Sequence, residues 1–175
     1  MLEVQDGSPA TLIESMVVLE YLEDIAPKTL SPMERANARL FAALFQPALS
    51  YIPILKAEPG SEEEAAAVDE LRDGLKAIDN YLTAHGSADG PFLLGERFSM
   101  AEAATAPFAQ RFAAVLPGLR PGLDPHSLLT DNGLTRLADW LQAVCERESC
   151  VETLPPPEEL VANYKKLLER MAAAA

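Results

Sequence analysis

Glu14 and Ser15 are the neighbouring residues whose types best suit binding of a charged ligand. Apolar residues such as Val18 and Leu22 share one face of the next segment, which predicts a helix over residues 15–25. The free backbone N–H groups at a helix start attract a carboxylate, and the Ser15 hydroxyl adds a donor. The Glu14 carboxylate can accept hydrogen bonds from an ammonium group. Judged from residue types alone, however, a simple helix cap is the preferred interpretation of this pair.

Ser99 and Glu102 have the spacing of a capping box in front of an apolar helix. The serine hydroxyl can accept from the amide of residue 102, and the glutamate can return a bond to the amide of Ser99. Loss of such a cap typically costs about 1 kcal/mol. The pair therefore predicts a structural feature, the start of a helix.

The cysteines and histidines do not form a metal-binding pattern. Cys145 and Cys150 have no second cysteine pair near them, and His85 and His126 stand alone. Acidic neighbours of the two cysteines would raise a thiol pKa. We expect two reduced, partly buried thiols and no metal site.

Composition excludes several classes of protein. The 175 residues carry 27 acidic and 14 basic side chains, a formal net charge of -13, and no basic run. A nucleic-acid surface or a site for anionic membranes needs clustered Lys and Arg, so both are disfavoured. We also expect no secretory signal and no membrane-spanning segment, since the apolar stretches look shorter than the roughly 20 residues that a span requires.

The pattern of apolar residues predicts a small hairpin followed almost entirely by helices. Short strands are expected at residues 2–4 and 11–13, and a proline-containing linker is expected at 27–33. A long apolar helix should cover 34–56, with a bend or break caused by Pro47 and Pro53. Its two apolar rows suggest that it faces both the core and something else.

Three further amphipathic helices are expected beyond this long one. The first starts at a capping box, Ser61 to Glu64, and ends before Gly86, where we expect a left-handed residue. The stripes that predict these helices are Val68, Leu71, Leu75, Ile78 and Leu82; Leu134, Leu137, Leu141 and Val144; and Leu160, Tyr164, Leu167 and Met171.

Two segments resemble cytosolic glutathione transferases. The stretch from Phe92 to Glu102, FLLGERFSMAE, resembles the signature that opens the central helix of their C-terminal domain. LIES at residues 12–15 resembles their last thioredoxin-like strand running into the third helix. The family usually has Asp where Glu102 stands and a larger apolar residue at Ala103. Residues Ala106, Pro107, Phe108 and Arg111 look most like the omega-like and related fungal groups.

The resemblance implies the fold and the domain limits. We expect a mostly α protein: a remnant of a thioredoxin-like glutathione-binding domain at residues 1–26 (two strands and one helix), the linker at 27–33, and an all-helical domain at 34–175. It also implies a cytoplasmic homodimer with a role in detoxification.

The resemblance further implies the ligands. Glutathione is the expected substrate, with its γ-glutamyl end at Glu14 and Ser15, and the partner is a small hydrophobic electrophile or a disulfide. Electrophile-site candidates are Phe41, Phe45, Phe108, Arg111 and Phe112. The alternative for these five is that aromatics at helical spacing are core residues, and that Arg111 lays its stem on apolar surface.

A catalytic residue is not expected within these 175 residues. In the family the catalytic Tyr, Ser or Cys lies in a strand-helix-strand-helix segment before the hairpin, and no such segment is present here. Tyr21, Tyr51, Tyr81 and Tyr164 look like ordinary helix-face aromatics. We therefore expect the chain alone to be inactive, through a truncated gene model or as a genuine short form. The alternative function is a non-enzymatic protein-interaction module.

Overall fold

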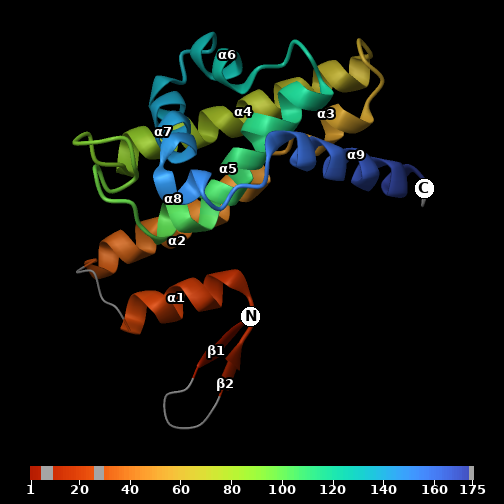
Figure 1. Ribbon diagram of the computed structural model, residues 1–175. Helices are drawn as coiled ribbons and strands as arrows, with labels where there is room; N and C mark the ends of the chain where they lie inside the picture. The colour runs from red at the N-terminus through yellow and green to blue at the C-terminus, as the bar shows by residue number, and fades with distance from the viewer. Residues whose placement is uncertain (5–9, 26–29, 174–175) are drawn as a thin grey trace.

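The structure, a computed structural model, describes residues 1–4, 10–25 and 30–173. Figure 1 shows its elements, which in chain order are β1 (Leu2–Val4), β2 (Ala10–Leu12), α1 (Ser15–Ile25), α2 (Pro32–Ala48), α3 (Ile52–Lys56), α4 (Glu62–His85), α5 (Met100–Leu119), α6 (Pro125–Thr130), α7 (Thr135–Glu146), α8 (Glu148–Val151) and α9 (Pro157–Ala173). The predicted architecture is confirmed: a mostly helical protein preceded by two strands and one helix.

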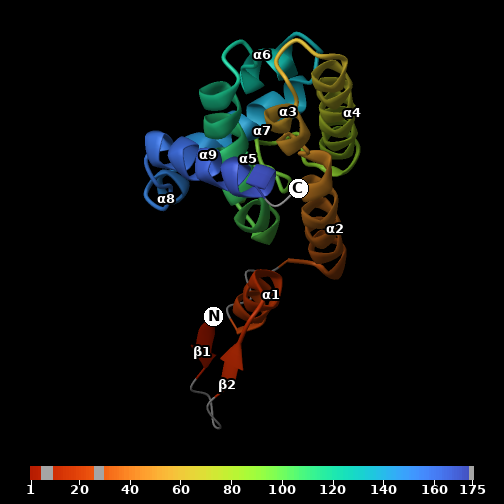
Figure 2. The ribbon, with the colours of Figure 1, turned by 90° about the vertical axis from the view of Figure 1, so that its right-hand side faces the viewer.

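The hairpin and α1 lie together at one end of the molecule, outside the helical bundle (Figures 1 and 2). β1 and β2 pair antiparallel, with Leu2 opposite Leu12. The second strand lies one residue earlier than predicted, whereas α1 has the predicted bounds. Met16 of α1 packs against the core of the bundle, and Arg39 of α2 donates to Glu20 of α1 (2.8 Å).

Helix α2 starts at Pro32, two residues before its predicted start, because a capping box precedes it. The Glu34 amide donates to Ser31 Oγ (3.2 Å), and the Ser31 amide donates to the Glu34 carboxylate (2.7 Å). The bond from the Ser31 backbone, with help from Arg97, holds the pKa of Glu34 below its usual value. The Ser-Pro-Met-Glu spacing signals this start, and the linker interpretation overlooked it. Residues 27–29 of the predicted linker lie outside the described residues.

The predicted break in the long apolar segment is present. Helix α2 ends at Ala48, directly after Pro47, and α3 begins at Ile52 with Pro53 in its first turn. By length and composition, residues Pro32–Lys56 would suffice to cross a membrane, which the sequence interpretation overlooked. The helix is interrupted at residues 49–51, and one face of α2 is buried in the protein core, as expected for a core helix.

Helix α4 lies between Ser61 and Gly86 as predicted, but the capping at both of its ends differs from the prediction. Ser61 caps the helix by accepting from the Glu64 amide (3.1 Å), but the Glu64 carboxylate does not return the bond. It accepts instead from the Gly60 amide (2.7 Å) and from Arg120 (3.1 Å), so the reciprocal capping box is wrong here. Gly86 has φ -80° and is not left-handed. The predicted apolar stripe of α4 is entirely buried.

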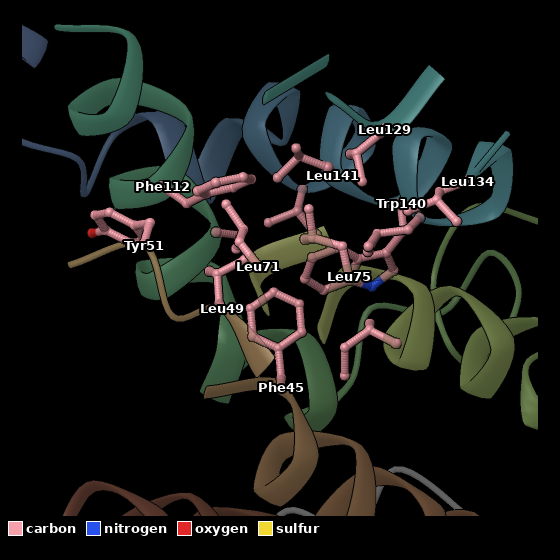
Figure 3. Packing of buried hydrophobic residues seen from close by; sticks show 14 of the residues in the cluster. Phe45, Leu49, Tyr51, Leu71, Leu75, Phe112, Leu129, Leu134, Trp140 and Leu141 are labelled. Atoms are coloured by element: carbon pink, nitrogen blue, oxygen red, sulfur yellow. The ribbon is translucent and has the colours of Figure 1, made fainter. Parts of the chain in front are cut away.

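Helix α5 runs through the middle of the bundle, with α2 and α4 on one side and α9 on the other (Figure 2). It contacts α1, α2, α6, α7 and α9. Side chains from these helices form one apolar core, part of which Figure 3 shows. Trp140 of α7 lies at its centre, with its ring 5.0 Å from that of Phe45 and 5.5 Å from that of Phe41.

The last two predicted stripes have different outcomes. All four residues of the α7 stripe are buried. In α9 only Leu160 is buried, Tyr164 is partly buried, and Leu167 and Met171 remain 42% and 36% exposed. Because α9 packs against α5 on one side only, the end of its stripe is left on the surface.

Candidate functional site

Glu14 occupies an unusual backbone conformation at the start of α1. Its φ is 68°, the one positive φ of a non-glycine residue in the described part of the chain. Such conformations cost on the order of 1–3 kcal/mol and are concentrated at ligand sites. The Glu14 carbonyl accepts from the Val18 amide (3.0 Å), which makes Glu14 the N-cap and Ser15 the first residue of the helix.

The start of α1 can receive both charges of a zwitterion. The side chains of Glu14 and Ser15 are exposed. The first N–H groups of a helix have no intrahelical acceptors, so they can hold a carboxylate, and the hydroxyl of Ser15 adds one donor. The Glu14 carboxylate beside them can accept from an ammonium group. Glu14 and Ser15 are thus exposed neighbours at a helix start, and their role in holding glutathione stays a prediction.

A groove of about 530 Å³ lies between the end of α2, the following loop, α5 and α9. Two of the five electrophile-site candidates, Phe108 and Arg111, line it. The remaining lining residues are Gln46, Pro47, Leu49, Ser50, Tyr51, Ile52, Tyr164 and Leu167.

The other three candidates lie in the core. Phe41, Phe45 and Phe112 are 0%, 2% and 1% exposed. Their rings pack against Trp140, Tyr81 and Tyr51, so a ligand could reach them only by opening the core. The structure therefore favours the core alternative for these three residues.

Two tyrosines meet in the groove, a pairing that the sequence interpretation missed. The hydroxyls of Tyr51 and Tyr164 are 3.1 Å apart, and their rings are stacked at 6.2 Å. The Tyr51 ring packs on Phe112, and Figure 3 shows its hydroxyl turned away from the core cluster. Burial, followed by the bond to Tyr164, raises the pKa of Tyr51 well above its usual value. Both hydroxyls serve as hydrogen-bonding groups, and Tyr51 is no ready nucleophile.

The side chain of Arg111 is held in a fixed position in the same groove. Its Nε–H donates to the Pro107 carbonyl (2.7 Å), and its guanidinium lies 4.6 Å from the centre of the Phe108 ring. Arg111 is only partly exposed. The groove thus combines apolar walls with one oriented cation.

Burial outweighs the other influences on both cysteines, although Ser149 and Arg147 act to lower the pKa of Cys150. Burial, then Cys150 and Glu146, raise the pKa of the Cys145 thiol to about 11. Burial also raises the pKa of Cys150. Both are free thiols, which react slowly when protonated. Over residues 1–4, 10–25 and 30–173, no cluster of three or more His, Cys, Asp or Glu side chains could hold a metal ion.

The capping box of α5 is present and extends further than predicted. The Ser99 amide donates to Glu102 Oε2 (3.0 Å), while Ser99 Oγ caps the helix amides. Glu102 is 0% exposed, and its Oε1 also accepts from the Leu93 amide (2.8 Å) and from Trp140 Nε1 (3.2 Å). This buried carboxylate joins the loop at Leu93, the start of α5 and helix α7 by hydrogen bonds, and a ligand cannot reach it.

Residues 62–143 match the family described as glutathione S-transferase, C-terminal domain. A probable glutathione S-transferase from Nicotiana tabacum is 25% identical over 98% of this chain and 73% of its own length. Among solved structures, the trimeric glutathione transferase TDR1 of Leishmania superposes with a TM-score of 0.70 at 26% identity, covering 94% of this chain and 36% of that one. Rice GST1 in complex with glutathione has a TM-score of 0.66 at 24% identity, covering 94% and 72%.

These matches agree with the two segments that suggested the family. The family match spans the capped start of α5 and the buried stripe of α4. The alignment with the tobacco relative extends over nearly all of the chain, and so includes α1. Residues 62–143 therefore match the C-terminal domain of glutathione S-transferases, and the chain as a whole is similar to these enzymes in sequence and fold.

Proposed function

We propose that this chain binds glutathione at the start of α1 and an electrophile in the groove between α2, α5 and α9, for glutathione-dependent conjugation or thiol transfer. The observation that carries the proposal is the left-handed Glu14 directly before the first turn of α1. The Glu14 side chain is exposed, so side-chain packing does not explain its strained backbone, whereas a ligand site would account for it.

The γ-glutamyl end of glutathione matches this site in charge. Its carboxylate would bind the free amides and the hydroxyl at Ser15, and its ammonium would bind the Glu14 carboxylate. Such a local arrangement is needed because glutathione is an anion and the chain carries a net charge of -13.

Two reactions are compatible with the proposal. In conjugation, the glutathione thiolate forms a bond to an electrophilic carbon, the leaving group departs with its electron pair, and the thiol proton passes to solvent. In thiol transfer, the thiolate attacks a disulfide, whose S–S bond breaks and releases the second thiolate. An omega-like class is part of the proposal, and it is supported by the Glu14–Ser15 helix start, the segment from Ala106 to Arg111 and the acidic composition.

We also propose that the 175 residues alone bind glutathione without turning it over. The thiols of Cys145 and Cys150 have raised pKa values and stay protonated, and the buried Tyr51 hydroxyl is already bonded to Tyr164, so we expect none of the three to activate the glutathione thiol. The proposed cytoplasmic location agrees with the two free cysteines, because a reducing compartment would keep their thiols reduced.

Calorimetric titration of the chain with glutathione tests the site. We expect binding that weakens roughly tenfold in Glu14→Gln and in Ser15→Ala, because each removes a charge-assisted hydrogen bond. Glu63→Gln and Ser127→Ala are matched controls, since both residues are exposed in the first turn of another helix. A chloroarene assay on the same sample measures turnover, which we expect to be absent.

Absence of glutathione binding to a folded chain would reject the proposal and favour the non-enzymatic interaction module. Equal affinity in Glu14→Gln and Ser15→Ala would reject the assigned residues. Turnover of the chloroarene by the 175 residues would reject the proposed inactivity and show that a residue of this chain activates the thiol.

A further inference from the structure

Arg111 is a cation without an anionic partner in the described part of the chain. Ion pairs with Asp or Glu engage Arg35, Arg39, Arg72, Arg97 and Arg120. Arg111 instead uses its Nε–H on the Pro107 carbonyl and stacks on Phe108, and its two terminal nitrogens meet no acceptor among the described residues. The guanidinium is therefore oriented while its outer edge is left free to bind.

The tyrosine pair provides a further donor in the same groove. Two hydroxyls have two hydrogens, and the bond between Tyr51 and Tyr164 consumes one of them. With Tyr51 as the donor, the Tyr164 hydrogen has no acceptor among the described residues. A tyrosine hydroxyl is protonated at neutral pH, and burial moves the pKa of Tyr51 further in that direction, so both hydrogens of the pair are present.

The remainder of the groove is mostly apolar. Pro47, Ile52, Phe108 and Leu167 line it, and Leu167 is 42% exposed. An occupant must therefore present an apolar body to these side chains and an acceptor to Arg111 and the tyrosine pair. A carboxylate fits best, because its two oxygens match the two terminal nitrogens of a guanidinium.

We propose that the groove selects electrophiles that carry a carboxylate on an apolar, ring-sized body. That the bound compound reacts as an electrophile rests on the proposed function, whereas binding of the carboxylate in the groove does not. In a protein of net charge -13, an anion needs a local positive group or a helix start to offset the general repulsion, and Arg111 is the cation available in the groove.

A pair of matched probes tests the selection on the whole chain, without glutathione. Chloronitrobenzoate and its methyl ester share the substituted ring, and the ester replaces the negative charge of the carboxylate by a neutral methyl ester. We expect the benzoate to bind roughly fivefold tighter than the ester, as for a partly exposed ion pair, and this preference to shrink at high salt. The measurement is an NMR titration that follows backbone amides and the Arg111 Nε–H.

Variants assign the preference to the named side chains. Arg111→Gln should abolish the preference for the benzoate, Arg111→Lys should retain part of it, and Tyr164→Phe should reduce it roughly twofold. Arg170→Gln, on the exposed end of α9, and Tyr21→Phe, on α1, should leave it unchanged. Amide spectra establish that each variant is folded.

Equal affinity for the benzoate and the ester, or an undiminished preference in folded Arg111→Gln, would overturn the inference. Because glutathione is absent from this experiment, its failure is separate from failure of the proposed function. If glutathione does not bind but the carboxylate preference is measured, the groove is an anion site and the proposed conjugating role is rejected. If glutathione binds and the preference for the benzoate is absent, only the proposed carboxylate selection by the groove is rejected.

Discussion

At the scale of single residues, Glu102 shows how a cap can become part of a core. Its position three residues after Ser99 is a local feature of a helix start. Its contacts with Leu93 and Trp140 are not local, because they join α5 to the preceding loop and to α7. A fully buried carboxylate is tolerated here since every donor around it points at its two oxygens.

Replacing Glu102 should therefore destabilise the bundle more than loss of an ordinary cap. In Glu102→Ala the amides of Leu93 and Ser99 and the Trp140 indole lose their acceptor, which should cost at least about 3 kcal/mol. Glu102→Asp keeps the helix cap but is one methylene shorter, so we expect a loss of about 1 kcal/mol. Urea unfolding followed by circular dichroism measures both.

Glu63→Ala is the control for this series, since Glu63 is an exposed residue of a first turn. Trp140 fluorescence gives a local readout, because its indole donates directly to the carboxylate. A loss below about 0.5 kcal/mol in Glu102→Ala would contradict the role assigned to the buried carboxylate.

At the scale of elements, Gly74 sets how closely α2 and α4 approach. A Cβ atom at Gly74 would lie 2.1 Å from the carbonyl oxygen of Ala48, the last residue of α2. Glycine within a helix normally costs about 1 kcal/mol relative to alanine. Here the absence of a side chain permits backbone contact at the point where Pro47 ends the helix.

Gly74→Ala should consequently destabilise the protein despite its better helix propensity. The clash is with backbone, which cannot rotate away, so we expect a net loss of about 1–3 kcal/mol in urea unfolding. Gly118→Ala is the comparison, because its Cβ would meet the Val161 side chain at 2.5 Å, which can shift more cheaply. A more stable Gly74→Ala would show that α2 and α4 are further apart than this contact requires.

At the scale of the whole molecule, α2 has two apolar faces. Phe41 and Phe45 are buried in the core, whereas Met33, Leu40 and Leu44 are 69%, 49% and 41% exposed. Their spacing brings these three onto one face of the helix. This surface agrees with the predicted second role of the helix and supports the proposal of a homodimer.

Light scattering after size exclusion tests the dimer. We expect a mass of two chains, and a single chain for the double variant Leu40→Glu and Leu44→Glu, since burying each leucine contributes about 1.5–3 kcal/mol. Val151→Glu is the control at another exposed apolar residue. A single chain at all concentrations would contradict the homodimer. A mass of three chains would contradict it too, and would match the trimeric transferase of Leishmania instead.

Much of the fold was predictable because its signals are local. Helix phases follow from the spacing of apolar residues, which identified the buried stripes of α4 and α7. The cap of α5 and the break after Pro47 also depend on residues within one turn of each other. The cap at Ser31 is an equally local signal, but it lies within the predicted linker.

The sequence by itself determined where α1, α4 and α5 begin, which faces of the long helices are apolar, and which segments resemble a known family. Tertiary structure decided which apolar residues are core and which line the groove, because that depends on how helices cross. It also brought Tyr51 to Tyr164 across 113 residues, and Trp140 to Glu102 across 38. No spacing rule encodes such pairs, since they arise only when α5, α7 and α9 have packed.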